Sequence, residues 1–137
     1  MSGDLNQTVH GQKFVDQDTF YRALIKGKYN KAGTKAVPRA FNDDRDGSCP
    51  SVDWASLSSP EETAGRLPNT KDQDKPIKVA SISAKSIWEC SLDIKHDPLP
   101  ENHAHCQILG DKGQVDFAGD EARFRLAQAT TIIYTAD

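Results

Sequence analysis

The sequence lacks any long apolar run. No stretch reaches the roughly eighteen consecutive apolar residues that a membrane-spanning helix requires, so we expect no such helix. The first residues, MSGDLNQTVHGQ, also lack the apolar centre of a secretory signal peptide. Only three cysteines are present, Cys49, Cys90 and Cys106, and none belongs to a C-x-x-C pair. These absences predict a soluble cytoplasmic protein whose thiols are reduced.

Apolar residues and net charge are both low for this chain of 137 residues. Apolar side chains make up 36%, or about 43% with the nine glycines, against roughly 45–50% in an average domain. The formal net charge is -3 with both signs interspersed, so nucleic acid is expected to bind only through a local patch. The length predicts a single domain over residues 18–137, preceded by a polar tail or edge segment over residues 1–17.

Alternation of apolar and polar side chains predicts several strands. They cover residues 51–55, 77–82, 92–95 and 104–109. In the first of these, Val52 and Trp54 share one face, so Asp53 lies on the opposite face and can face a site. Residues 19–25 fit either a strand or a short helix. Residues 37–41 fit an edge strand or an extended arm, because their proline disfavours a central strand.

Capping signals predict where the helices begin. Ser59 precedes Pro60 and two glutamates, which predicts the start of a helix that ends before Pro68. Ser83 is predicted to cap a short helix that reaches Cys90. Asp120 is predicted to cap a third helix. Its apolar residues are Ala122, Phe124, Leu126 and Ala129.

The order of these elements predicts the fold class. Residues 131–134 form a closing strand or the end of the third helix. Strands and helices then mix without strict β-α-β alternation. We therefore expect a compact α+β domain with a mixed or antiparallel sheet and two or three short helices.

The segment Lys95–Gly110, KHDPLPENHAHCQILG, is the most distinctive part of the chain. It holds three of the four histidines, one cysteine and two prolines. Imidazole titrates near neutral pH and also binds metals. However, the spacing matches no paired C-x2-4-C or H-x3-5-H arrangement, and His105 and Cys106 would point to opposite faces of a strand. No metal site and no cofactor are predicted.

Two histidines of this segment are candidates for acid–base catalysis. His96 and His105 can divide the base and acid roles if the strands on either side of the turn run antiparallel. Asn102 can orient one imidazole. The cations that can stabilise a phosphate are Arg22, Lys95 and Arg39. This interpretation predicts a metal-independent enzyme acting on a nucleotide or RNA phosphodiester, whereas a tight turn with histidines bonded to backbone accounts for the same residues without catalysis.

Five stretches of the chain carry a resemblance. They read FYRAL, PRAF, SVDWASLSSPEET, KVASISAKSI and HDPLPENHAHCQILG. Together they resemble a group of small uncharacterised bacterial proteins. The pattern of that group combines an early tyrosine-arginine, an S-x-A-F, an S-V-D with a downstream P-E-E, and H-D-P-x-P-x-N-P-A-H-A. The resemblance spans roughly residues 20–110, and its last motif is the most specific.

The resemblance ranks the residues of the histidine-rich segment. His105 and Asn102 stand at the histidine and asparagine positions of the last motif. His103 and Cys106 stand where the pattern has proline and alanine, which argues against either as a ligand or a catalyst. The resemblance implies a rigid turn that presents Asn102 and His105, and it carries no established activity.

These observations predict a bacterial binding or accessory module for a protein or nucleotide partner. No motif specifies a reaction, so the sequence leaves open whether the protein is an enzyme, and the phosphodiester enzyme is the alternative. The candidate catalytic residues are His105 and His96, and the candidate binding residues are Asn102, Arg22 and Asp53.

Overall fold

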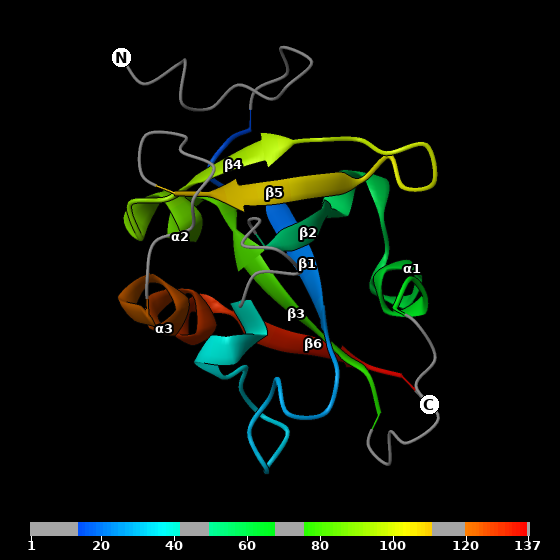
Figure 1. The fold of residues 1–137 in the computed structure, drawn as a ribbon. Helices are drawn as coiled ribbons and strands as arrows, with labels where there is room; N and C mark the ends of the chain where they lie inside the picture. Colours follow the sequence, from blue (N-terminus) through cyan, green and yellow to red (C-terminus); the bar gives the residue numbers. More distant parts are fainter. Residues whose placement is uncertain (1–13, 42–49, 68–75, 111–119, 137) are drawn as a thin grey trace.

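The computed structural model describes residues 14–41, 50–67, 76–110 and 120–136. Within these residues the chain forms one six-stranded antiparallel sheet and three α-helices, which confirms the α+β class (Figure 1). No helix in the described ranges is both long and apolar enough to cross a bilayer.

The strands follow the order β4-β5-β2-β1-β3-β6, and each neighbouring pair is antiparallel. The strand bounds are Thr19–Leu24 for β1, Ser51–Trp54 for β2, Lys78–Ser83 for β3, Asp93–His96 for β4, His105–Leu109 for β5 and Thr131–Thr135 for β6. The α-helices are α1 (Pro60–Gly65), α2 (Ala84–Glu89) and α3 (Asp120–Ala129), and the 3-10 helices are η2 (Pro38–Phe41) and η3 (Ala55–Leu57).

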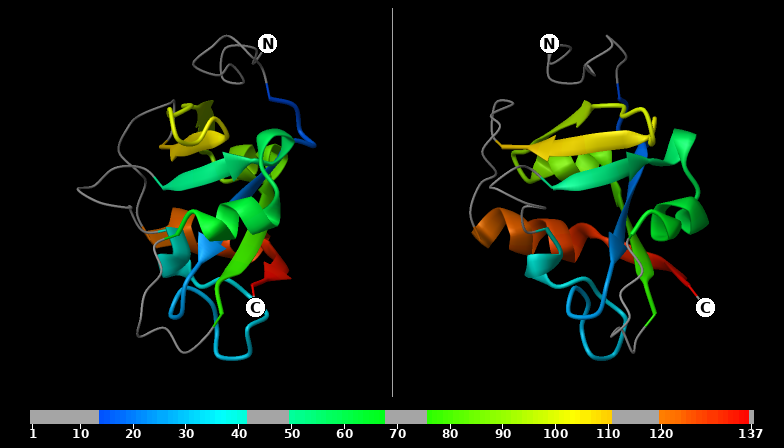
Figure 2. Two further views of the ribbon diagram at one scale, coloured as in Figure 1. Left: turned by 90° about the vertical axis from the view of Figure 1, so that its right-hand side faces the viewer. Right: turned by 45° about the vertical axis from the view of Figure 1, so that its right-hand side comes forward.

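The main core lies on one face of the sheet. Phe20 and Leu24 of β1 are buried there, beside Val52 of β2 and Ile108 of β5. Successive side chains of a strand point to opposite faces, so these alternate positions share one face. α2, α3 and η2 cover it, and Figure 2 shows η2 (cyan) beside α3 (orange). These elements contribute the buried residues Ile87, Leu126 and Phe41.

α1 packs on the opposite face of the sheet, against β1 and β3. Ala64 of α1 and Val79 of β3 are both buried, and neither belongs to the main core. In Figure 1, α1 lies on the side of the sheet away from α3. This second layer extends over β1, β3 and β6.

The predicted start of α1 is confirmed. The Ser59 hydroxyl accepts the backbone N–H of Glu62 at 3.1 Å, and the Glu62 carboxylate accepts the backbone N–H of Ser59 at 2.9 Å. Pro60 occupies the first helical position, where its missing N–H costs nothing. The helix ends at Gly65 with Arg66 as its C-cap residue, before Pro68 as the sequence predicts.

Replacing Ser59 by alanine is expected to lower the free energy of unfolding by about 1 kcal/mol, because the Glu62 N–H loses its acceptor. Urea denaturation of the parent and of Ser59→Ala measures the difference. The neighbouring Ser56→Ala is a matched control, since Ser56 is exposed and precedes the helix. Equal losses in the two variants would show that the cap does not stabilise α1.

Two segments that the sequence left ambiguous are resolved as strands. Residues 19–24 of the first segment form β1, which pairs with both β2 and β3 and is therefore held as a strand from both sides. Residues 131–134 lie in β6, which pairs with β3. The Ser83 cap is also confirmed, since its hydroxyl accepts the Ser86 N–H at 3.1 Å and α2 ends before Cys90.

The prediction for residues 37–41 was wrong. Pro38 begins the 3-10 helix η2 and not an extended arm, and the Ala40 N–H donates to the Val37 carbonyl at 2.8 Å. The fixed backbone angle of proline suits a helical first turn as well as an extended chain, and burial of Ala40 and Phe41 selects the turn.

The apolar residues of α3 do not all share one face of the helix. Ala122 and Leu126 are buried, whereas Phe124 is 51% exposed. Residues two apart on a helix differ by about 200° around its axis, so Phe124 lies on the opposite side from both. α3 begins at Asp120, whose side chain lies outside the described structure, so its cap stays a prediction.

Candidate functional site

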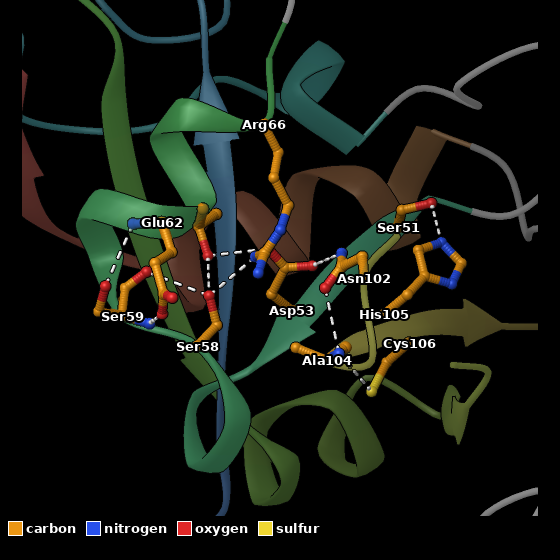
Figure 3. Close-up of polar contacts among 11 residues, drawn as sticks. Ser51, Asp53, Ser58, Ser59, Glu62, Arg66, Asn102, Ala104, His105 and Cys106 are labelled. Carbon is orange, nitrogen blue, oxygen red and sulfur yellow. Dashed lines mark hydrogen bonds and ion pairs between the residues drawn. The ribbon is translucent and has the colours of Figure 1, made fainter. Parts of the chain in front are cut away.

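Asp53 is the centre of a buried polar network on the sheet face away from the main core (Figure 3). Its Oδ2 accepts the Thr63 hydroxyl at 2.8 Å and Arg66 Nη1 at 2.6 Å. Arg66 Nη1 also donates to Ser58 Oγ at 2.9 Å. Thr63 of α1 and its C-cap residue Arg66 therefore satisfy Oδ2, and Ser58 holds the arginine in place.

Asn102 joins the histidine-rich turn to this network. Its Nδ2 donates to Asp53 Oδ1 at 2.8 Å, and its Oδ1 accepts the backbone N–H of Ala104 at 3.1 Å. The backbones of Leu99 and Asn102 exchange two hydrogen bonds of 3.0 Å, which close the turn. The structure thus brings Asp53 and Asn102 together, and both side chains are buried.

Thr63 and Arg66 are members of the network that the sequence did not predict. Thr63 lies in α1 and Arg66 is the C-cap residue three positions later, which puts their side chains on one face of the helix. α1 follows β2 after a short connection, so that face can reach Asp53. Helical spacing was therefore a usable signal, but nothing in the sequence showed that the face turns toward β2.

His105 lies on the same side of the sheet as Asp53, which is its cross-strand partner. Its Nε2 is 3.0 Å from the Ser51 hydroxyl, and its Nδ1 is 2.8 Å from the Asp97 backbone carbonyl. The Asp97 carboxylate oxygen Oδ2 is 3.5 Å from the same Nδ1. His105 is partly buried, with 12% of its side chain exposed.

His96 lies on the opposite face of the sheet from His105. It pairs with Cys106 across the strands, is 5% exposed, and its ring packs edge-on to Trp54 at 5.2 Å between ring centroids. Its Nε2 is 2.8 Å from the His103 carbonyl. The strands are antiparallel as expected, yet the structure does not bring the two imidazoles together. His96 pairs with Cys106, and Cys106 and His105 point to opposite faces of β5, so His96 points away from His105.

Arg22 is occupied by backbone groups of its own fold. Its Nε donates to the Ala40 carbonyl at 2.8 Å and its Nη1 to the Ser51 carbonyl at 2.6 Å. The guanidinium carbon also lies 5.7 Å from the centre of the Phe41 ring. These contacts link β1 to η2 and β2, so Arg22 has a structural role. Because its guanidinium is engaged in these bonds, it is poorly placed to bind a phosphate.

His103 and His105 are expected to differ in their effect on stability. Replacing His105 by alanine removes its hydrogen bonds to the Ser51 hydroxyl and to the Asp97 carbonyl, and should lower the free energy of unfolding by about 1–3 kcal/mol. His103 is exposed, and alanine keeps the carbonyl that meets His96, so His103→Ala should change it by no more than about 0.5 kcal/mol. Urea titration of both variants checks this ranking, and the reverse order would contradict it.

The cysteines show no sign of an active thiol. Burial raises the pKa of Cys106 far above its usual value, and the nearby carboxylates of Asp53 and Asp97 raise it further. Burial also raises the pKa of Cys90. Both thiols are free, and Cys49 lies outside the described residues. Within the described ranges, no three histidine, cysteine or acidic side chains gather as a metal site would need.

We expect Cys106 to resist a thiol reagent such as Ellman's reagent in the native protein, because a raised pKa leaves little thiolate to react. After denaturation without reductant, all three cysteines should react. A single reactive thiol in the denatured protein would instead reveal a disulfide. Fast reaction at native Cys106 would show that its strand opens readily.

Comparison of the chain with known protein families, with curated proteins and with solved structures finds no match.

Proposed function

We propose that this domain is a protein-binding module of the bacterial cytoplasm and that it recognises its partner through an apolar patch around Trp54. The patch consists of Val15, Trp54 and Leu57. Val15 is 56% exposed and Leu57 is 48% exposed. Large apolar side chains gathered at an exposed site are a common mark of a protein-interaction surface.

The carboxylate of Asp18 holds two members of the patch together. Its Oδ2 accepts the backbone N–H of Val15 at 2.7 Å, and its Oδ1 accepts the indole N–H of Trp54 at 3.1 Å. Phe14, the neighbour of Val15, packs edge-on to the Trp54 ring at 4.9 Å between centroids. Asp18 and Phe14 therefore hold the backbone of Val15 close to the indole.

Leu57 joins the patch through the short helix η3. Trp54 is the residue that precedes this 3-10 helix and Leu57 is its last residue. Because η3 follows directly after β2, Leu57 lies at the same end of β2 as Trp54. Tryptophan is among the side chains that binding hot spots favour, so Trp54 is the expected anchor of the patch.

The placement of the histidines supports a binding function over the phosphodiester enzyme. That enzyme requires His96, His105 and a cation to face one substrate. His96 instead packs in the core, and Arg22 donates to backbone carbonyls. The patch around Trp54 needs no such convergence.

The test compares the proteins recovered from a lysate of the source cells with four tagged baits: the parent, Leu57→Glu, Val15→Glu and Phe124→Glu. Phe124 is a matched control because it is also about half exposed but belongs to α3, which is not part of the patch. We expect a partner whose recovery is lost with Leu57→Glu and with Val15→Glu but kept with Phe124→Glu. Recovery that is the same for all four proteins would contradict the proposal, provided that their melting temperatures agree.

A further inference from the structure

The register between β2 and β5 brings a serine and a histidine together on the sheet face away from the core. Asp53 pairs with His105 and Ser51 pairs with Gln107, so Ser51 lies diagonal to His105 on the same face. The Ser51 hydroxyl and His105 Nε2 are 3.0 Å apart. Diagonal neighbours are within reach of a side chain as long as histidine.

The Asp97 backbone determines which nitrogen of His105 carries the proton. A carbonyl oxygen can only accept a hydrogen bond, so the 2.8 Å contact requires Nδ1 to be the protonated nitrogen. In the neutral ring Nε2 is then a lone-pair acceptor, and the Ser51 hydroxyl must be the donor. The hydroxyl proton therefore already points at the nitrogen that would remove it.

Asp97 supplies both an orienting group and a charge. Its backbone N–H donates to the His105 carbonyl at 2.9 Å, so the two residues are held by a reciprocal pair of contacts. Its carboxylate Oδ2 lies 3.5 Å from Nδ1, and 36% of this side chain is exposed. A carboxylate at that distance stabilises the imidazolium that forms when His105 accepts a proton.

We propose that Ser51 is a nucleophile for carboxylic esters, with His105 as its general base and Asp97 as the positioning residue. This activity goes beyond the protein-binding function and uses residues outside the patch around Trp54. It needs neither His96 nor a metal.

The reaction balances with these groups and water. Ser51 Oγ forms a bond to the ester carbonyl carbon while its proton passes to His105 Nε2, and the bond to the leaving alkoxide or phenolate breaks. Water then attacks the acyl-serine, with His105 taking its proton after returning the first one to the leaving group or to solvent. The acid is released, and Ser51 Oγ regains a proton from His105.

The test uses a biotinylated fluorophosphonate, because its phosphorus is attacked by an activated serine with loss of fluoride. Peptide mapping of the labelled native protein should locate the phosphonate on Ser51. Ser51→Ala should lose the label. Ser56→Ala is a matched control, since Ser56 is exposed on η3, and it should be labelled as fast as the parent.

Replacement of the base distinguishes catalysis from packing. His105→Ala should slow labelling of Ser51 by at least about 100-fold, the lower end of the usual contribution of a general base. Free imidazole should restore part of the rate, which a merely structural histidine would not allow. Asp97→Asn should slow labelling less than His105→Ala, because the backbone carbonyl of residue 97 still selects the Nδ1–H form.

Two results would overturn the proposal. The first is a native parent in which the phosphonate is absent or maps to another residue, and this result does not depend on whether any variant folds. The second is a folded His105→Ala protein that is labelled at Ser51 as fast as the parent. Hydrolysis of p-nitrophenyl acetate that is lost in Ser51→Ala and kept in Ser56→Ala would extend the assignment from labelling to turnover.

Discussion

Replacing Asp53 by alanine is expected to lower the free energy of unfolding by about 2–4 kcal/mol, since each buried donor left without its acceptor costs roughly 1–3 kcal/mol. Thr63 and Asn102 are buried and would each lose the acceptor of a hydrogen bond. Arg66 would lose its carboxylate, but its partly exposed side chain can turn to water, which places the loss toward the lower end. Urea denaturation followed by circular dichroism measures the change.

Two comparisons sharpen this test. Asp16→Ala should change stability by no more than about 0.5 kcal/mol, since Asp16 is exposed. Arg66→Ala should cost less than Asp53→Ala, because Asp53 would keep Thr63 and Asn102 as donors. A loss of under about 1 kcal/mol in Asp53→Ala would show that water replaces the network on the sheet.

Replacing Phe20 by alanine is expected to cost about 3–5 kcal/mol, through the lost burial of the ring and the cavity that it leaves. Phe20 is 0% exposed and lies in β1, between β2 and β3. Its ring packs edge-on to Phe14 at 5.0 Å between centroids, so the substitution also removes an aromatic contact. Thermal and urea unfolding of the variant measure the loss.

Phe124→Ala is the matched control for this prediction. The same ring is removed, but Phe124 is 51% exposed on α3, so we expect a change within about 0.5 kcal/mol. A large loss in both variants would mean that the Phe124 ring is buried by packing in solution. A small loss in both would mean that the sheet around β1 relaxes to fill the cavity.

The Asp53 network and the Ser51–His105 pair are linked through β2 and through the turn before β5. Asp53 and Ser51 lie two residues apart on the same face of β2, and Asp53 is the cross-strand partner of His105. Asn102 then fixes the turn from which β5 begins. Loss of the network should therefore loosen the register that holds the Ser51 hydroxyl near Nε2, so stability and labelling of Ser51 are expected to fall together in Asp53→Ala.

The sequence correctly predicted those features of the fold that depend on residues close together in the chain. The Ser59-Pro60-Glu62 cap and the Ser83 cap are each formed by contacts within three residues, and both are confirmed. Alternation over residues 104–109 correctly separated buried Cys106 and Ile108 from partly exposed His105. Such predictions succeed because capping and strand alternation depend on short stretches of backbone.

The sequence by itself thus determined the α+β class, the starts of α1 and α2, and the two faces of β2 and β5. Only the tertiary structure decided which side chains and elements each face of a strand or helix contacts. It placed His96 in the core and His105 beside Ser51, turned Arg66 toward Asp53, and chose a helical turn for residues 38–41. The physical reason is that a strand's alternation separates its two faces, whereas the register that aligns one strand with the next depends on pairing and burial summed over residues far apart in the chain.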